Sequence, residues 1–318
     1  MWIARSCRVL RPSVGQRSMS VLGGMSDDLL ISMNMGHSIG GMSQSSLVDS
    51  LIKAGVLTTP RVQEAFRSLD RGHFVLQGHA PNDIYANRPL KIGTVATIST
   101  PQQHAQVIEF LADHLQPGNE AIDVGCGSGY LAAIMAKLVG PTGRVTGVDI
   151  VPSLVDLSKA NVAKAKVADV ITWTVASSGH DILPTNSTFD CIHIGVAVET
   201  MEQVDKLANH LKPGGGLVVP LGYAGSEQLL LKVTKDAKSG SFHKERVLNV
   251  LCQPLLNVAP EELQVPETRD EKVKRLQAVL EEWKANFIKT HQRVPSRQDM
   301  LLDEQAAKWF AEFAATRK

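Results

Sequence analysis

A short glycine-rich turn between a predicted strand and a predicted helix constrains the fold of this chain more than any other feature. The turn runs from Asp123 to Gly129 and reads D-V-G-C-G-S-G. Its glycines allow the backbone to turn sharply and leave room for a ligand against the main chain. A second apolar stretch ends in Asp149, 20 residues after Gly129 (149 − 129), and a carboxylate at this spacing reaches ribose hydroxyls. The pattern predicts an α/β fold with a cofactor site at the turn.

The residues around the turn narrow the class of cofactor. A nicotinamide-binding fingerprint, G-x-G-x-x-G/A, would need a small residue where this chain has Tyr130. An acid directly before the turn, Asp123, followed by G-x-G-x-G, is similar instead to motif I of class I S-adenosylmethionine (SAM) methyltransferases. A tight strand–helix turn without a ligand is the alternative interpretation.

Strands and helices are predicted to alternate over residues 45–260, the expected SAM domain. Apolar strands are expected at 144–149, 170–175 and 189–195, with helical patterns between them. This alternation is typical of a doubly wound, mainly parallel sheet with helices on both faces. Pro213 and the three glycines after it, at 214–216, are expected to close a helix over 204–211, and a strand pair is expected to follow at 217–221 and 228–234.

The two ends of the chain differ from this domain. Residues 1–44 begin with four arginines and no acid before Asp27, and continue into a linker rich in Met, Gly and Ser. This composition predicts a mitochondrial transit peptide; a basic tail on a cytoplasmic protein is the alternative. Residues 261–318 predict a C-terminal helical extension with an apolar stripe from Val273 to Phe287. The stripe is expected to pack within this unit, against the main domain or against a protein partner.

Composition gives no sign of several other classes of protein. Lys plus Arg number 33 and Asp plus Glu number 32, so no overall charge favours nucleic acid. The four cysteines are far apart and lack C-x-x-C spacing, which favours neither a disulfide framework nor a zinc site. No apolar run approaches the ~20 residues of a membrane span. We therefore expect no bound metal, no nucleic acid and no membrane span.

The segment from Tyr85 to Ala105 points to the substrate. It reads Y-x-N-x-P-x-x-I-G-x-x-A-T-I-S-T-P-x-x-H-A and resembles the substrate loop of protein-L-isoaspartate (D-aspartate) O-methyltransferases. The resemblance extends from about Ser45 to Pro254 and includes the glycine turn, the strand ending in Asp149, and F-D-x-I-H-I-G from Phe189. It implies a SAM-dependent enzyme that methylates the α-carboxylate of isoaspartyl residues in damaged proteins and so starts their repair.

The resemblance also implies roles for individual residues. Ser99 matches the active-site serine, beside the methyl group and the substrate carboxylate. Residues expected at the cofactor are Ala96, Thr97, Ile98, Ser99, His104, Asp123, Gly125, Gly127, Ser128, Gly129, Asp149, Ile150 and Ser177. Ser177 stands where the family has an acid that contacts adenine, which predicts weaker cofactor affinity. Asn87 and Gln102 also replace the residues usual in the family's loop.

The predicted chemistry agrees with the residue types present. A carboxylate has a pKa near 4 and is already an ionised nucleophile at neutral pH, so no general base is needed, and none is evident around Ser99. Two other functions compete with this one. The chain could be a catalytically weakened SAM-fold subunit that serves assembly of a mitochondrial complex, or a methyltransferase for another acceptor such as an amine.

Overall fold

The fold was analysed in a computed structural model that describes residues 39–92, 96–177, 182–184, 186–223, 225–256, 269–296, 299–300 and 303–316. Most of the predicted transit segment, residues 1–38, lies outside the described residues. Among the described helices, none is both long enough and apolar enough to cross a membrane.

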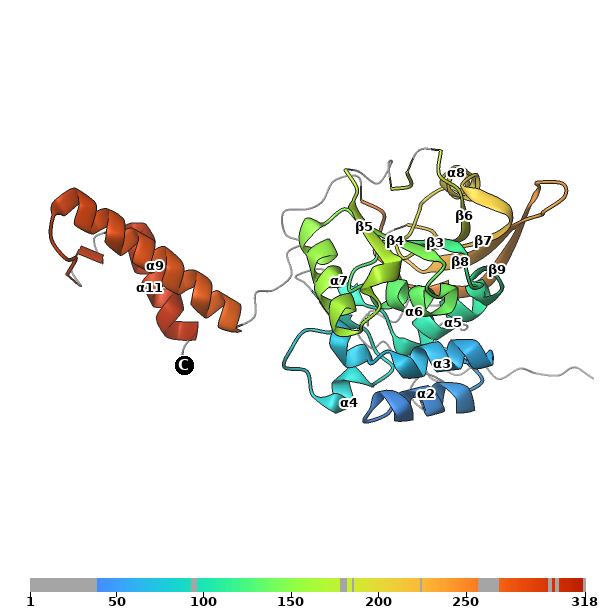
Figure 1. Ribbon diagram of the computed structural model, residues 1–318, viewed down its shortest axis with the longest axis horizontal. Helices are drawn as coiled ribbons and strands as arrows, with labels where there is room; N and C mark the ends of the chain where they lie inside the picture. Colours follow the sequence, from blue (N-terminus) through green and yellow to red (C-terminus); the bar gives the residue numbers. More distant parts are fainter. Residues whose placement is uncertain are drawn as a thin grey trace, which may run out of the picture.

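A seven-stranded sheet forms the centre of the main domain (Figure 1). Its strands are β3 (Glu120–Val124), β4 (Arg144–Asp149), β5 (Ile171–Val175), β6 (Phe189–Ile194), β7 (Leu211–Leu221), β8 (Gln228–Lys235) and β9 (Phe242–Val250). The strand order is β5-β4-β3-β6-β7-β8-β9, parallel from β5 to β7 and antiparallel for β8 and β9. The chain proceeds outward from β3 to β5 and then returns to place β6 on the other side of β3. Ligands of open α/β sheets bind at such a reversal, beyond the carboxyl ends of the strands.

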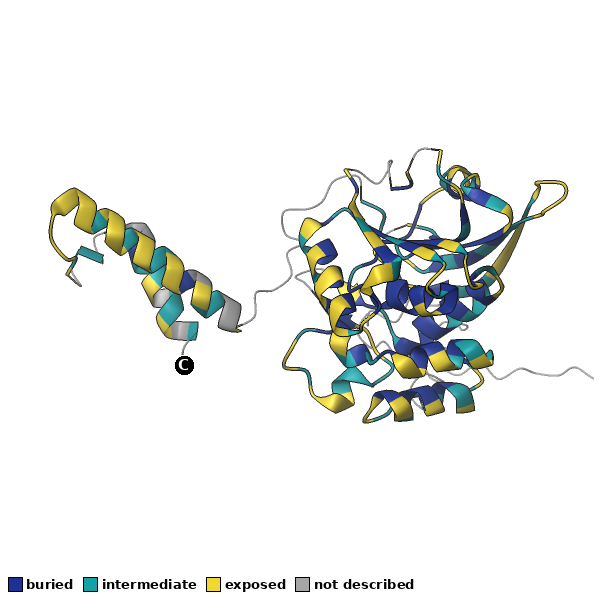
Figure 2. Cartoon of the chain, viewed as in Figure 1, coloured by how far each residue is buried: buried dark blue, intermediate teal, exposed yellow. Residues whose placement is uncertain are grey.

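Helices cover both faces of the sheet (Figure 1). They are α2 (Gln44–Lys53), α3 (Pro60–Ser68), α4 (Pro81–Ile84), α5 (Pro101–Leu111), α6 (Tyr130–Val139), α7 (Pro152–Lys164) and α8 (Met201–Ala208), with short 3-10 turns η1 (Arg71–Phe74), η2 (Ala112–His114) and η3 (Ala168–Val170). One apolar core lies on the side of α5, α6 and α7, and a second lies on the side of α8. Helix α6 is buried almost all round (Figure 2), because α3 packs on the side away from the sheet. The predicted doubly wound, mainly parallel fold is therefore confirmed.

Local sequence signals explain how the segment with Ser99 meets helix α5. A two-stranded ladder pairs β1 (Leu90–Lys91) with β2 (Thr97–Ile98) directly before it. Thr100 then caps α5, because its side chain accepts a hydrogen bond from the backbone N–H of Gln103, and Pro101 fits the first helical turn. The cap fixes the direction in which the chain leaves Ser99.

One prediction about the end of the sheet was wrong, and one strand was missed. Residues 213–216 do not close a helix with a turn but lie inside β7, next to a register irregularity in its pairing with β6. Gly216 is small for a packing reason, since a Cβ there would lie 2.2 Å from the ring of His114. Strand β9 was not expected, because it is a largely exposed edge strand with charged residues and no apolar pattern.

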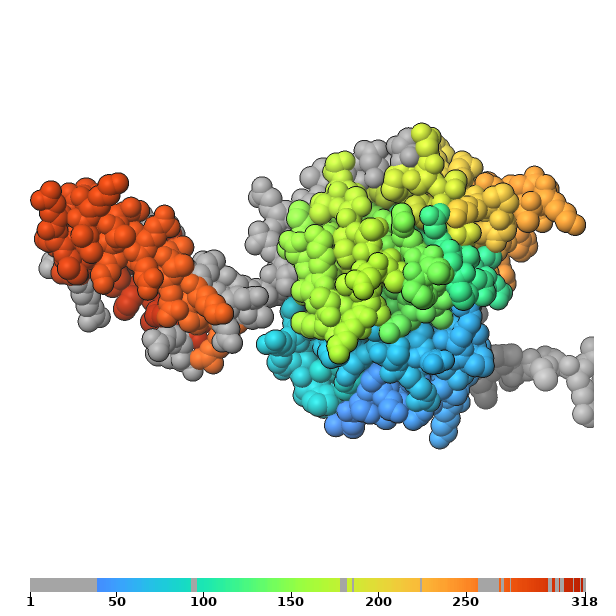
Figure 3. Space-filling view, in the orientation of Figure 1, coloured from blue at the N-terminus to red at the C-terminus, as the bar shows by residue number. Residues whose placement is uncertain are grey.

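Helices α9 (Arg269–His291) and α11 (Glu304–Thr316) form an antiparallel hairpin after the sheet domain (Figures 1 and 3). Leu276 on α9 and Ala306 on α11 are fully buried. The Trp283 indole Nε1–H donates to the Asp303 carboxylate at 2.7 Å. The predicted apolar stripe thus packs, at least in part, inside the C-terminal unit.

Candidate active site

A cleft opens beyond the carboxyl ends of β3, β4 and β6. It consists of a smaller cavity of about 80 Å³ and a larger one of about 160 Å³. Both are lined by Thr97, Gly125, Gly127 and Gly195. Because the two cavities share these lining residues, they are adjacent, and one elongated ligand can occupy both.

The glycine turn forms the floor of the cleft. Gly129 is the N-cap of α6 and has φ 80°, and a Cβ there would lie 3.1 Å from the side chain of Ser158. Two buried polar residues of α7 hold the turn in place: the Ser158 hydroxyl donates to the Gly127 carbonyl at 3.0 Å, and the Asn161 amide donates to the Ser128 carbonyl at 3.1 Å. The turn is therefore a rigid part of the fold.

Asp149 lies at the end of β4 and lines the larger cavity. Its Oδ2 accepts the backbone N–H of Gly127 and its Oδ1 accepts that of Val151, both at 3.1 Å. Burial raises the pKa of this carboxyl above its usual value. Each carboxylate oxygen has a second lone pair, so the ionised group can accept two ribose hydroxyls while it keeps both backbone bonds. The apolar residues Ile150, Val151, Ile182 and Leu255 line the same cavity and suit a flat base.

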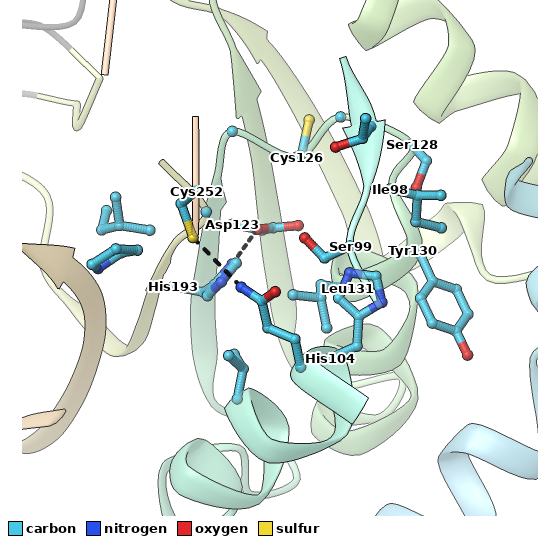
Figure 4. A pocket seen from close by; sticks show the side chains of 18 of the residues that line it. Ile98, Ser99, His104, Asp123, Cys126, Ser128, Tyr130, Leu131, His193 and Cys252 are labelled. Atoms are coloured by element: carbon cyan, nitrogen blue, oxygen red, sulfur yellow. Dashed lines mark hydrogen bonds and ion pairs between the residues drawn. The ribbon is translucent and has the colours of Figure 1, made fainter. Parts of the chain in front are cut away.

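Asp123 and His193 form a buried pair at the other end of the cleft (Figure 4). They are cross-strand neighbours on β3 and β6, and His193 Nδ1 lies 2.7 Å from Asp123 Oδ1. Asp123 is only 1% exposed, and its second oxygen, Oδ2, has no hydrogen-bond partner among the described residues. A buried carboxylate oxygen without a partner is costly. The ammonium group of a methionine moiety would donate to it, so this free acceptor in the smaller cavity fits SAM.

Ser99 and His104 line the same smaller cavity (Figure 4). The Ser99 carbonyl accepts a hydrogen bond from the guanidinium of Arg71 at 2.8 Å. His104 is buried on α5 with its ring 5.3 Å from that of Tyr130. Burial, with smaller effects of Arg71 and His193, lowers the pKa of His104 well below its ordinary value. The imidazole is therefore neutral at physiological pH.

Most residues predicted for the site do meet in this cleft. The smaller cavity is lined by Thr97, Ile98, Ser99, His104, Asp123, Gly125, Gly127 and Ser128. The larger cavity is lined by Ala96, Thr97, Gly125, Gly127, Asp149 and Ile150. Gly129 starts α6 directly behind the turn. Ser177 is exposed and lines neither cavity, so its role at adenine stays a prediction.

Sequence reasoning missed several residues of the cleft. His193 gave a usable signal, as a polar residue inside an otherwise apolar strand. Tyr130 and Cys252 gave none: Tyr130 stands out in the sequence only as too large for a nicotinamide turn, and Cys252 enters the cavity from beyond β9. Within the described residues, no group of three His, Cys, Asp or Glu could hold a metal ion.

The strand order, the glycine turn and the acid at the end of β4 define a SAM-dependent methyltransferase of class I. A family model described as protein-L-isoaspartate(D-aspartate) O-methyltransferase (PCMT) matches residues 42–258. The chain belongs to this family.

Individual relatives agree with this assignment. A protein-L-isoaspartate O-methyltransferase of Triticum aestivum is 38% identical over 216 residues, which cover 66% of this chain and 90% of the relative. Protein-L-isoaspartate O-methyltransferase 2 of Arabidopsis thaliana is 37% identical over 220 residues, 68% of this chain and 69% of the relative. A solved protein-L-isoaspartate O-methyltransferase from Plasmodium falciparum matches with a TM-score of 0.59 and 27% identity over 67% of this chain and 98% of its own. That structure is a complex with S-adenosyl-L-homocysteine.

Proposed function

We propose that this protein transfers the methyl group of SAM to the free α-carboxylate of L-isoaspartyl, and D-aspartyl, residues in damaged proteins. One observation supports this most directly: Ser99, from the segment that resembles the family's substrate loop, lines the same cavity as Asp123 and the glycine turn. The acceptor side and the cofactor side of the reaction are thus adjacent in the fold.

SAM, when bound, supplies an electrophilic methyl group on a sulfonium. Asp149 and Asp123 would hold its two ends, through ribose hydroxyls in the larger cavity and through the ammonium in the smaller one. The Ser99 hydroxyl would donate a hydrogen bond to the acceptor carboxylate and orient one of its oxygens toward the methyl carbon. Such positioning can lower the barrier by up to ~7–11 kcal/mol.

The transfer requires no proton acceptor. The ionised carboxylate oxygen forms a bond to the methyl carbon as the carbon–sulfur bond breaks, and the electron pair of that bond stays on sulfur. The resulting methyl ester is a better electrophile than the carboxylate. The next backbone nitrogen therefore attacks it, releases methanol and closes a succinimide, whose hydrolysis returns part of the residue to normal aspartate.

The test compares an isoaspartyl peptide with its aspartyl twin, and follows methyl transfer and methanol release. We expect transfer to the isoaspartyl peptide alone, because its carboxylate is displaced by one methylene relative to the backbone. Ser99→Ala should lower kcat and leave binding of S-adenosylhomocysteine unchanged, whereas Ser241→Ala, in an exposed turn far along the chain, should change neither. A protein that binds S-adenosylhomocysteine but methylates no isoaspartyl peptide would contradict the repair function and favour an assembly subunit or another acceptor.

We further propose that residues 1–44 direct the protein to mitochondria, with the cytoplasm as the alternative. The support is their composition, four arginines before the first acid at Asp27. A fluorescent reporter fused to residues 1–40 should enter mitochondria, and the same fusion with the four arginines changed to glutamine should not. A wild-type fusion spread through the cytosol would refute the proposal.

We also propose that the C-terminal hairpin offers a surface for a protein partner. Part of its apolar stripe is buried between α9 and α11, but two apolar residues outside the stripe, Ile288 on α9 and Phe310 on α11, are 38% and 40% exposed. Changing both to serine should abolish association with a partner while methyl transfer to a short peptide continues. Unchanged association in that variant would exclude this surface.

A further inference from the structure

Arg71 has an unusual environment for an arginine. It is 0% exposed, and no carboxylate pairs with its guanidinium among the described residues. Its hydrogen-bond partners are instead backbone carbonyls from separate segments: Nε donates to Ile84 at 3.1 Å, and Nη2 donates to Ser99 at 2.8 Å and to Arg88 at 3.5 Å. Burying a cation without an acid to pair with it is costly. The hydrogen bonds to these carbonyls offset part of that cost and fix the position of the guanidinium.

The remaining nitrogen of Arg71 faces His104. Nη1 lies 3.4 Å from His104 Nδ1. A guanidinium has donors only, so Nδ1 can form this contact only as an acceptor. In a neutral imidazole the single ring proton must then be on Nε2. If Nδ1 were protonated as well, His104 would be a cation, and its Nδ1–H would face the Nη1–H of Arg71, a second cation, in a buried site.

His193, which lines the same cavity, carries its proton on the other ring nitrogen. Its Nδ1 lies 2.7 Å from Asp123 Oδ1, an acceptor, so Nδ1 carries the proton. A neutral His193 thus offers a lone pair at Nε2, whereas a neutral His104 offers an N–H. The two histidines differ because one faces a carboxylate and the other faces a guanidinium.

We propose that Arg71 is a positioning residue that fixes His104 as an Nε2–H donor and fixes Ser99 through its carbonyl, so that both donors are in place for a carboxylate ligand. This inference rests on the proposed function for the identity of that ligand. The carboxylate at Ser99 is that of the isoaspartyl acceptor, and the carboxylate at His104 belongs either to the same acceptor or to the methionine moiety of the cofactor. The same Arg71 contacts also hold the loop at Ile84 and Arg88 against the segment with Ser99.

The direct test is NMR of the histidine ring nitrogens, with the His104 signal assigned from a His104→Gln spectrum. In the wild-type protein we expect His104 to be neutral at physiological pH with its proton on Nε2. A proton on Nδ1, or a charged His104, would overturn the proposal. This measurement needs neither a variant of Arg71 nor any methyl transfer, so it is independent of the repair function.

Arg71→Met tests the consequence. It should allow the Nδ1–H tautomer of His104 and should lower kcat/KM for an isoaspartyl peptide by about ten- to hundredfold, as expected for a reacting group misplaced by about 1 Å. Unchanged affinity for S-adenosylhomocysteine would place the acceptor carboxylate at His104, and a parallel loss of affinity would place the cofactor carboxylate there. Arg67→Met is the matched control, because Arg67 pairs with Asp49 on the surface of α3. If Arg71→Met leaves tautomer, rate and affinity as they are in the wild type, the proposal is wrong.

Discussion

Asp149→Ala should weaken the binding of S-adenosylhomocysteine by about ten- to hundredfold. The carboxylate is expected to accept charge-assisted hydrogen bonds from the ribose, which contribute about 1.5–3 kcal/mol, and each 1.4 kcal/mol is tenfold in affinity. Asp149 also accepts the backbone N–H groups of Gly127 and Val151. Its removal therefore leaves the buried N–H of Val151 and the half-buried N–H of Gly127 without this acceptor. Each N–H that water does not satisfy costs about 1–3 kcal/mol of folding stability.

Asp149→Asn is expected to be no milder. The N–H groups of Gly127 and Val151 bond to different oxygens of Asp149, and an amide in the same position keeps an oxygen at only one of these two sites. The other backbone N–H would face the amide NH₂ group. Affinity should fall as in Asp149→Ala, and the midpoint of thermal unfolding should also fall, by about 2–4 °C for each kcal/mol lost in a domain of this size.

Titration calorimetry with S-adenosylhomocysteine checks the affinity, and Asp156→Asn, which changes an exposed acid on α7, serves as the control. The wild-type affinity should decrease as pH falls through the raised pKa of Asp149, because the neutral carboxyl is the weaker acceptor. For the free protein the sign is opposite: a folded-state pKa above the unfolded value means that stability falls as pH rises through that window. Unchanged affinity in Asp149→Ala would refute the assignment of the ribose site.

Three further results are expected. Asp123→Asn should weaken the binding of S-adenosylhomocysteine, measured by calorimetry, because the unpartnered Oδ2 is assigned to the ammonium group. It should not change the affinity for an analogue without the α-amino group, and equal losses for both ligands would contradict the assignment. Gly129→Ala should lower the free energy of unfolding in urea by about 1–3 kcal/mol, since alanine would adopt φ 80° with its Cβ 3.1 Å from Ser158; an unaltered midpoint would show that the turn relaxes. A chain that ends at residue 258 should methylate a short isoaspartyl peptide at the full rate, because the residues that line the cleft lie within 92–256. A strong loss of kcat would place the C-terminal hairpin at the active site.

Much of the fold and cofactor site was predictable because the signals are local. The turn from Asp123 to Gly129 specifies its own backbone, since its glycines adopt positive φ. Asp149 ends the strand after the turn, and parallel strands with short connections bring their carboxyl ends to one edge. Ser99 could be placed by its resemblance to a known loop, and the structure puts it in the same cleft.

Other features depend on which segments become neighbours. Strand β9 has no apolar pattern of its own and forms because β8 offers it backbone partners. The run at 213–216 resembled a turn, but its last glycine, Gly216, leaves room for the ring of His114 packed against the strand. Neither fact can be read from composition or spacing within the segment.

The sequence by itself determined the parallel sheet, the glycine turn and the acid at the end of β4, because backbone preference and short-range periodicity specify them. Only the tertiary structure decided which hydrogen-bond donors and acceptors the two histidines present to the smaller cavity. Asp123 faces His193 because β3 and β6 are adjacent, and Arg71 faces His104 because its side chain extends from η1 to the first turn of α5. Whether a buried histidine donates or accepts depends on the group opposite it, and that group comes from a distant part of the chain.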